Sequence, residues 1–167
     1  MIGWLDSFLQ SVHDQDLSTS IRESTWTYPI VESVHVITIS VFVGFAVLLD
    51  LRLMGVFLTR LPVSRVEAAL LPRTRLAFVV MVISGLVLLY AKPTETVANP
   101  FFLIKMAVIA IAAANIYFFH WVASANIEAW DADAKPPVRV RASGVVSILC
   151  WVTVVVCGRL IAYNWFK

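Results

Sequence analysis

The sequence predicts an all-α membrane protein, an antiparallel four-transmembrane-helix bundle with an N-terminal amphipathic interfacial helix. Three observations lead to this fold class. Hydrophobic residues make up 60% of the 167 residues and charged residues only 14%, which is far more apolar than a soluble domain. Four apolar segments reach the ~20 residues that a membrane span needs. The segments between them are short, as is typical of neighbouring antiparallel helices in a bundle.

The length of the chain predicts a single membrane domain over residues 1–167. The formal net charge is only +2 and there is no long basic tract, so we expect membrane lipid as a partner and no nucleic acid. The sequence has no glycine-rich phosphate loop, no CxxC or HExxH motif and no serine elbow. A soluble-type active site is therefore not expected, and the sequence assigns no catalytic residue.

Residues 1–27 are expected to form an arm at the membrane interface. Apolar side chains recur in it at helical spacing, at Trp4, Leu5, Phe8, Leu9 and Val12. This pattern predicts a short amphipathic helix over residues 2–12 that lies in the plane of the interface. The arm has no basic residue before Arg22 and contains several aspartates, which argues against a cleaved signal peptide.

The four spans are expected at about residues 29–57, 75–91, 101–123 and 143–163. The second is the shortest, and Pro72 just before it suits the first turn of a helix. The preceding residues 63–71 are expected to form a separate short amphipathic helix.

Basic residues concentrate in the first and third connecting segments. They are Arg60, Arg65, Arg73, Arg75, Lys135, Arg139 and Arg141. The second segment has only Lys92, and the arm only Arg22. The positive-inside rule places the first and third segments in the cytoplasm. We therefore expect a multi-pass protein of the bacterial inner membrane with both termini in the periplasm.

Ionisable residues inside spans are costly and usually mark a function. Counting 1.5 Å per residue along a helix puts His35 about 9 Å inside the outer end of the first span. By the same count Lys105 and Arg159 each lie about 6 Å inside the outer ends of the third and fourth spans. Three helices thus bring a histidine and two cations to similar depth, with Glu32 one turn from the histidine.

His120 lies at the opposite end of the third span, about 27 Å from its start. One haem between His35 and His120 is disfavoured, because their depths differ by something near 20 Å. Two sites fit better, each with one histidine as axial ligand and nearby Arg or Lys groups for the haem propionates. The sequence therefore predicts one or two haem b groups per chain. The sixth ligand of the outer haem could be His13, a residue of another subunit, or nothing.

Other roles remain open for these residues. A lone histidine inside a span can simply hydrogen-bond a neighbouring helix. Glu32 could orient the other nitrogen of His35 or carry protons beside it. A di-iron carboxylate site is disfavoured, because a second Glu-x-x-His pair is missing. Asp50 and Arg52 are expected to have a structural role, pairing with Arg73 or Arg75.

Three stretches carry a resemblance to known proteins: IRESTWTYPIVESVHVITISVFVGFAVLLDLRLMG, NPFFLIKMAVIAIAAANIYFFH and RVRASGVVSILCWVTVVVCGRLIAY. From Ile21 to Tyr163 the chain resembles a large family of uncharacterised bacterial four-helix membrane proteins. The positions that match the family pattern are Tyr28, Pro29, Glu32, His35, Gly44, Asp50, Arg52, Lys105, Asn115, His120, Trp151, Gly158, Arg159 and Tyr163.

More distantly, His35, the following Gly44 and DLRL, and Lys105 are similar to the pattern of copper-resistance D-type membrane proteins and HemJ-type protoporphyrinogen oxidases. In those families an intramembrane histidine is associated with b-type haem. The resemblance implies that His35 is a haem ligand and that Lys105 matches the lysine of their third span. His13 matches no part of the pattern.

These observations predict a b-type cytochrome, an electron-transfer protein that forms a homo-oligomer. It would pass electrons between a quinone or an inner-face donor and a periplasmic redox protein. One alternative is a membrane oxidoreductase that acts on a porphyrinogen or a small oxidant, with Lys105 and Arg159 steering an anionic substrate. Another is a non-redox permease or assembly subunit for copper or another ion. Clusters of Met, Cys and His at transport-like spacing are missing, which counts against copper.

Overall fold

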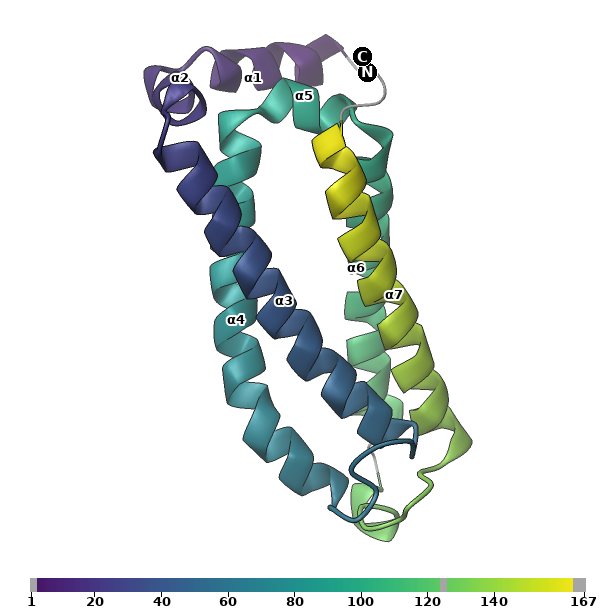
Figure 1. The fold of residues 1–167 in the computed structure, drawn as a ribbon. Helices are drawn as coiled ribbons and strands as arrows, with labels where there is room; N and C mark the ends of the chain where they lie inside the picture. Colours follow the sequence, from purple (N-terminus) through teal and green to yellow (C-terminus); the bar gives the residue numbers. More distant parts are fainter. Residues whose placement is uncertain (1–2, 124–125, 164–167) are drawn as a thin grey trace.

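A computed structural model of the protein describes residues 3–123 and 126–163, and these residues contain helices and no strand. Four of the helices are long and apolar enough to cross a membrane. The elements are α1 (Gly3–His13), α2 (Asp16–Glu23), α3 (Thr27–Leu53), α4 (Val63–Ala91), α5 (Pro93–Ala98), α6 (Pro100–Phe118), a π-helical turn (Phe119–Ala123), a 3-10 turn (Ile127–Ala129) and α7 (Val138–Tyr163) (Figure 1).

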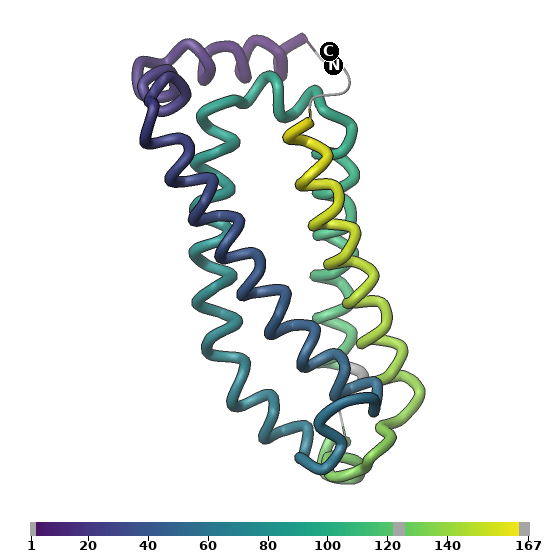
Figure 2. Tube along the Cα trace, viewed as in Figure 1, coloured from purple at the N-terminus to yellow at the C-terminus, as the bar shows by residue number. Residues whose placement is uncertain are grey.

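The long helices form two hairpins that join along one side. Helix α3 packs on α4 and α6 packs on α7, while the contact between α3 and α7 connects the two pairs. Figures 1 and 2 show the pairs close together where α3 ends and spread apart at the end that carries α1, α2 and α5. Helix α1 lies across this spread end.

The arm is tied to the end of α4 by hydrogen bonds. The buried Ser18 hydroxyl donates to the Tyr90 carbonyl at 2.9 Å. The Arg22 guanidinium donates to the Ala91 carbonyl at 3.2 Å. The last carbonyls of a helix have no partner within that helix. The arm therefore supplies donors that α4 itself cannot.

The expected break at Pro72 is wrong, because α4 runs through it as one helix. Proline removes one backbone N–H and usually breaks or kinks a helix. Here side chains of the next residues donate to the preceding turn: the Arg73 guanidinium to the Ala69 carbonyl and the Thr74 hydroxyl to the Leu70 carbonyl. Both side-chain bonds lie in the turn around Pro72, where proline removes one backbone hydrogen bond from α4.

The other boundaries also differ from the expectation. Helix α3 ends at Leu53 rather than near residue 57, and Gly55 turns the chain with a φ of 71°. A Cβ at Gly55 would lie 2.7 Å from the Ala134 carbonyl oxygen, so this turn requires glycine. Helix α7 begins five residues earlier than expected, at Val138. The second connection contains α5, which the sequence reasoning missed.

Arg52 joins the end of α3 to two connecting segments. Its side chain is fully buried. Nε donates to the Leu61 carbonyl at 2.7 Å, and Nη2 donates to the carbonyls of Asp131 and Asp133 at 3.2 and 3.0 Å. The structural role expected for Arg52 takes this form, through backbone carbonyls and not through Arg73 or Arg75.

Asp131 caps the start of α4 from across the chain. Its carboxylate accepts the Ser64 backbone N–H at 2.7 Å and the Ser64 hydroxyl at 2.6 Å. These two bonds, the hydroxyl first, hold the pKa of the Asp131 carboxyl below its usual range. A carboxylate at a helix N-terminus also interacts favourably with the helix dipole.

An apolar core fills the middle of the bundle. The Phe42 ring of α3 meets Trp151 of α7 edge-on, with ring centroids 4.6 Å apart. Ala77 of α4 and Ala112 of α6 are buried in the same cluster, together with Cys150 and Val154. Small residues let helices approach closely within a membrane bundle. This core closes the interior between the two ends.

We predict that Arg52→Met lowers the free energy of unfolding by about 2–4 kcal/mol, because three bonds from a charged donor are lost and water replaces only some of them. Denaturation by SDS in mixed micelles measures this. Arg139→Met, at an exposed arginine of the same end, is the control. Equal stability of the two variants would contradict the role assigned to Arg52.

Candidate functional site

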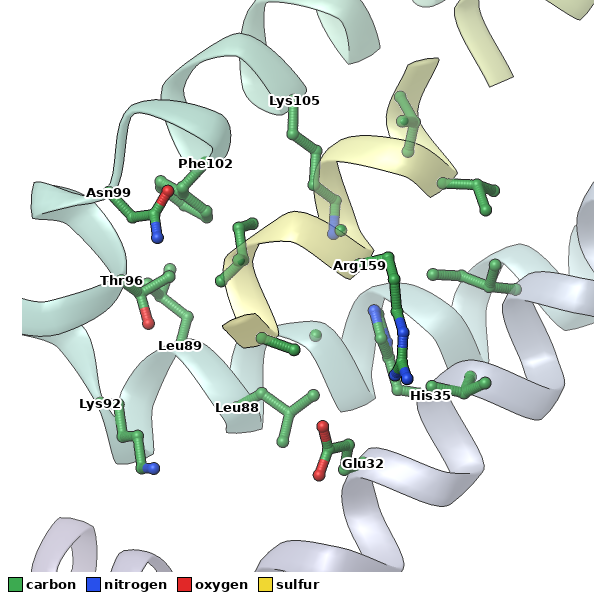
Figure 3. A pocket seen from close by; sticks show the side chains of 18 of the residues that line it. Glu32, His35, Leu88, Leu89, Lys92, Thr96, Asn99, Phe102, Lys105 and Arg159 are labelled. Atoms are coloured by element: carbon green, nitrogen blue, oxygen red, sulfur yellow. The ribbon is translucent and has the colours of Figure 1, made fainter. Parts of the chain in front are cut away.

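A cavity of about 480 Å³ lies at the spread end of the bundle, between the two hairpins. Side chains from three helices converge on it: Glu32 and His35 from α3, Lys105 from α6 and Arg159 from α7 (Figure 3). The structure thus brings together four residues that the sequence placed at similar depth. Its volume falls in the range of roughly 300–1,000 Å³ that is usual for ligand and cofactor pockets.

The imidazole of His35 is held by Ser84 of α4. Its Nδ1 lies 2.9 Å from the Ser84 hydroxyl oxygen. The Ser84 hydroxyl in turn lies 2.7 Å from the Val80 carbonyl, one turn earlier, and donates to it. A hydroxyl has one proton to donate, so when that proton goes to the Val80 carbonyl, Ser84 accepts from His35 and Nδ1 carries the ring proton. Nε2 then keeps a free lone pair for a ligand.

Gly85 makes room for the histidine ring. A Cβ at this position would lie 3.0 Å from His35 Cε1, which is tighter than most real Cβ contacts, and 3.5 Å from Nδ1, which is an ordinary contact. Helix α4 therefore presents a hydroxyl and a bare backbone, side by side, to one imidazole. The sequence reasoning missed both residues; a Ser-Gly pair inside an apolar span was the available signal, because small residues mark close helix contacts.

Lys105 and Arg159 bring positive charge to the cavity without a carboxylate partner. A Cβ at Gly158 of α7 would lie 3.9 Å from Lys105 Nζ, so the lysine reaches from α6 to α7. Arg159 lies over the Tyr163 ring, 5.3 Å from its centroid. Within residues 3–123 and 126–163, neither cation forms an ion pair, although Glu32 lines the same cavity. Unpaired cations inside a span favour an anionic ligand.

Polar side chains next to α5 also line the cavity. Lys92 stacks on the Tyr28 ring, with Nζ 4.7 Å from the ring centroid. The buried Asn99 accepts the Phe101 backbone N–H at 2.9 Å and caps the start of α6. Both Lys92 and Asn99 line the cavity. This cap fixes the first turn of α6, and with it the position from which Lys105 extends.

The structure does not bring His13 or His120 into this cavity. His13 Nδ1 lies 3.3 Å from Arg22 Nη1 and 3.4 Å from the Thr94 hydroxyl, at the junction of the arm with α5. His120 belongs to the π-helical turn beyond α6, at the other end of the molecule, where its side chain is exposed and packs on the Phe119 ring. The three histidines therefore lie in three separate places.

No group of three or more His, Cys, Asp or Glu side chains in the described part of the chain is placed to hold a metal ion. A haem iron differs from a bare ion, because the porphyrin supplies four ligands and the protein adds only one or two axial ones. One histidine beside a cavity is therefore enough for that cofactor.

A comparison with family models finds one match, to a family of unknown function, DUF6644, over residues 25–164. The chain belongs to the DUF6644 family. No curated protein and no solved structure matches it. The DUF6644 match covers all four convergent cavity residues and His120, while His13 lies outside it. No match links the chain to the copper-resistance D-type or HemJ-type proteins, so that similarity rests on its residues alone.

We predict that nitrogen-15 solid-state NMR of histidine-labelled protein without ligand shows His35 protonated at Nδ1 and not at Nε2. Ser84→Ala removes the acceptor and should abolish this preference. Ser33→Ala is the control, because the Ser33 hydroxyl donates to the Pro29 carbonyl of its own helix and not to His35. An unchanged tautomer in Ser84→Ala would contradict the arrangement.

Proposed function

We propose that the cavity binds one haem b and that the protein is an electron-transfer cytochrome of the membrane. One observation carries this proposal: an imidazole held by Ser84 lines the same cavity as two cations that form no ion pair with a carboxylate among the described residues. Imidazole is a common axial ligand of haem iron. Arg and Lys bind carboxylates such as the propionates of haem b through charge-assisted hydrogen bonds.

The residues fit haem in their chemistry. His35 would bind the haem iron through Nε2, while Lys105 and Arg159 would hold the propionates. Bound haem would supply a one-electron carrier. Ser84 orients the imidazole, Gly85 leaves space for it, and the Phe42–Trp151 core excludes water from below. Glu32, beside His35, could take up a proton as the charge of the site changes.

The position of His120 favours one haem per chain in this cavity. Its side chain is exposed at the opposite end, so a second haem there would need a wall from another protomer. We also propose a homo-oligomer, in which a neighbouring protomer would supply that wall and could supply a sixth ligand at either site. A quinone or inner-face donor and a periplasmic redox protein are the expected electron partners.

We further propose that the four long helices cross the bacterial inner membrane as an antiparallel bundle, with the arm on the periplasmic side. Support comes from the basic residues, most of which lie towards the end opposite the arm. The arm exposes large apolar side chains, among them Trp4, Phe8, Leu17 and Trp26. Such side chains, tryptophan above all, suit an interfacial position.

A membrane oxidoreductase is the second candidate. The observation that favours it is the positive charge of Lys105 and Arg159, which form no ion pair among the described residues and would also bind an anionic substrate such as a porphyrinogen or superoxide. A permease or assembly subunit has less support, because the apolar core around Phe42 and Trp151 closes the interior below the cavity.

We predict that the purified protein shows a b-type α-band in its reduced-minus-oxidised spectrum and that His35→Ala abolishes it. Lys105→Ala should weaken haem retention about tenfold or more, since a bond to a charged group contributes roughly 1.5–3 kcal/mol. Pyridine haemochrome stoichiometry per chain measures both effects. Arg139→Ala, an exposed cation at the far end, is the control and should retain haem.

Four other results of these measurements would each point to a different function or number of haem sites. The lack of any α-band, or unchanged haem content in His35→Ala, would overturn the cytochrome proposal. Loss of turnover in Lys105→Ala with haem content intact would favour the oxidoreductase. Copper in place of iron in the metal analysis would favour the permease or assembly subunit. Loss of half of the haem in His120→Ala would establish the second site.

We predict that a membrane-impermeant thiol reagent labels Ser7→Cys in spheroplasts, while Lys135→Cys reacts only after the membrane is permeabilised. Both positions are exposed, and the native Cys150 and Cys157 are buried. The unsubstituted protein controls for reaction at those two cysteines. The reverse labelling pattern would reverse the proposed orientation.

A further inference from the structure

A second group of buried polar side chains lies far from the cavity, where α3 crosses α7. Asp50 of α3 is only 6% exposed. The Ser147 side chain of α7, itself buried, lies beside the Asp50 carboxyl group. The Oδ2 atom of Asp50 is buried and has no hydrogen-bond partner in the described part of the chain. The proposed function uses none of these groups.

The helices approach closely at this point. A Cβ at Gly144 of α7 would lie 2.9 Å from the Asp50 carbonyl oxygen and 3.1 Å from Met54 Cγ. Ser143 and Ser147 are buried beside it, one turn apart on α7. The Ser143 hydroxyl donates to the Asn115 side-chain carbonyl at 3.1 Å, and the Asn115 amide donates to the Ser143 carbonyl at 3.0 Å. Polar contacts thus run from α3 through α7 to α6.

Among the described residues, no cation forms an ion pair with the Asp50 carboxyl. The nearest basic residue in the sequence, Arg52, turns to the carbonyls of the connecting segments. Arg73 of α4 donates to its own helix. Arg139 and Arg141 at the start of α7 are exposed. None of these groups forms an ion pair with Asp50 among the described residues. An isolated carboxylate in an apolar interior costs far more than a neutral acid.

We propose that Asp50 is a proton-binding site, and that the bound proton stabilises the α3–α7 junction. A protonated, neutral Asp50 agrees with three observations: the carboxyl group is buried, the Ser147 hydroxyl lies beside it, and no counter-ion is found among the described residues. When the carboxyl group releases its proton to water at this end of the bundle, a negative charge is left between α3 and α7. Because α3 and α7 make the main helix–helix contact between the two hairpins, the charge weakens the contact that joins them.

A bound sodium ion is the competing occupant of this site. Oxygen ligands suit such hard cations, and calcium, for example, takes 6–8 of them. Asp50 is here without other metal-ligating side chains, since no group of three or more His, Cys, Asp or Glu in the described part of the chain could hold a metal ion, and Ser147 adds one hydroxyl. The Asn115 side-chain oxygen already accepts the Ser143 hydroxyl, and the Ser143 backbone carbonyl already accepts the Asn115 amide N–H. The site therefore offers too few oxygens for a metal ion and enough for a proton.

Infrared difference spectroscopy of the full-length protein in nanodiscs tests the proposal. At neutral pH we expect the carbonyl stretch of a protonated carboxyl group. It should be absent in Asp50→Asn and shifted in frequency in Ser147→Ala. Asp133→Asn is the control, because Asp133 is an exposed aspartate at the same end, and it should leave the band unchanged.

Thermal unfolding measured against pH gives a second readout. The midpoint of the unsubstituted protein should fall as the pH rises and Asp50 ionises. Asp50→Asn should fold and remove this fall, since asparagine matches the size of the neutral acid. A carboxylate band at neutral pH, the same pH profile in both proteins, or a midpoint that depends on sodium in the unsubstituted protein but not in Asp50→Asn would overturn the proposal. All of these outcomes are independent of haem.

Discussion

The close crossing of α3 and α7 at Gly144 is the constraint on which the rest of the structure depends. Two helical hairpins meet there and are joined mainly by this helix pair. Next to the crossing, Arg52 holds both connecting segments of that end through three backbone carbonyls. Because the hairpins are fixed together at one end, their other ends can spread apart. The cavity exists at the spread end as a consequence, closed from below by the Phe42–Trp151 core.

Burying a polar group within a membrane is costly, so structural and functional residues can be told apart by whether they have partners inside the protein. A structural group finds its partners inside the protein, as Asn115 and Ser143 do with each other. Lys105 and Arg159 differ, since neither forms an ion pair in the described part of the chain. Their charges face a cavity that is large enough for a ligand. The free energy that a partly buried cation such as Lys105 loses on leaving water is recovered when an anionic group binds.

Depth along a helix could be predicted from the sequence, but contacts between helices could not. The fixed rise per residue was enough to bring Glu32, His35, Lys105 and Arg159 to one level. It also separated them from His120. We did not predict from the sequence that α4 continues through Pro72. The side-chain bonds of Arg73 and Thr74 around Pro72 have no recognisable sequence pattern. Ser84 and Gly85 were missed for a related reason: their importance comes from the ring of His35, which belongs to another helix.

Helix α3 connects the two polar regions mechanically. It is continuous from Thr27 to Leu53 and carries His35 at the cavity and Asp50 at the junction. Fifteen residues separate them, which is about 22 Å along the axis. A tilt of α3 by about 5° around the junction would therefore move His35 about 2 Å relative to Arg159 on α7. Phe42, which packs on Trp151 between the two sites, resists that tilt. If Asp50 is protonated or ionised as proposed, the angle between α3 and α7 would set how closely His35 and the cations of the cavity can approach one ligand.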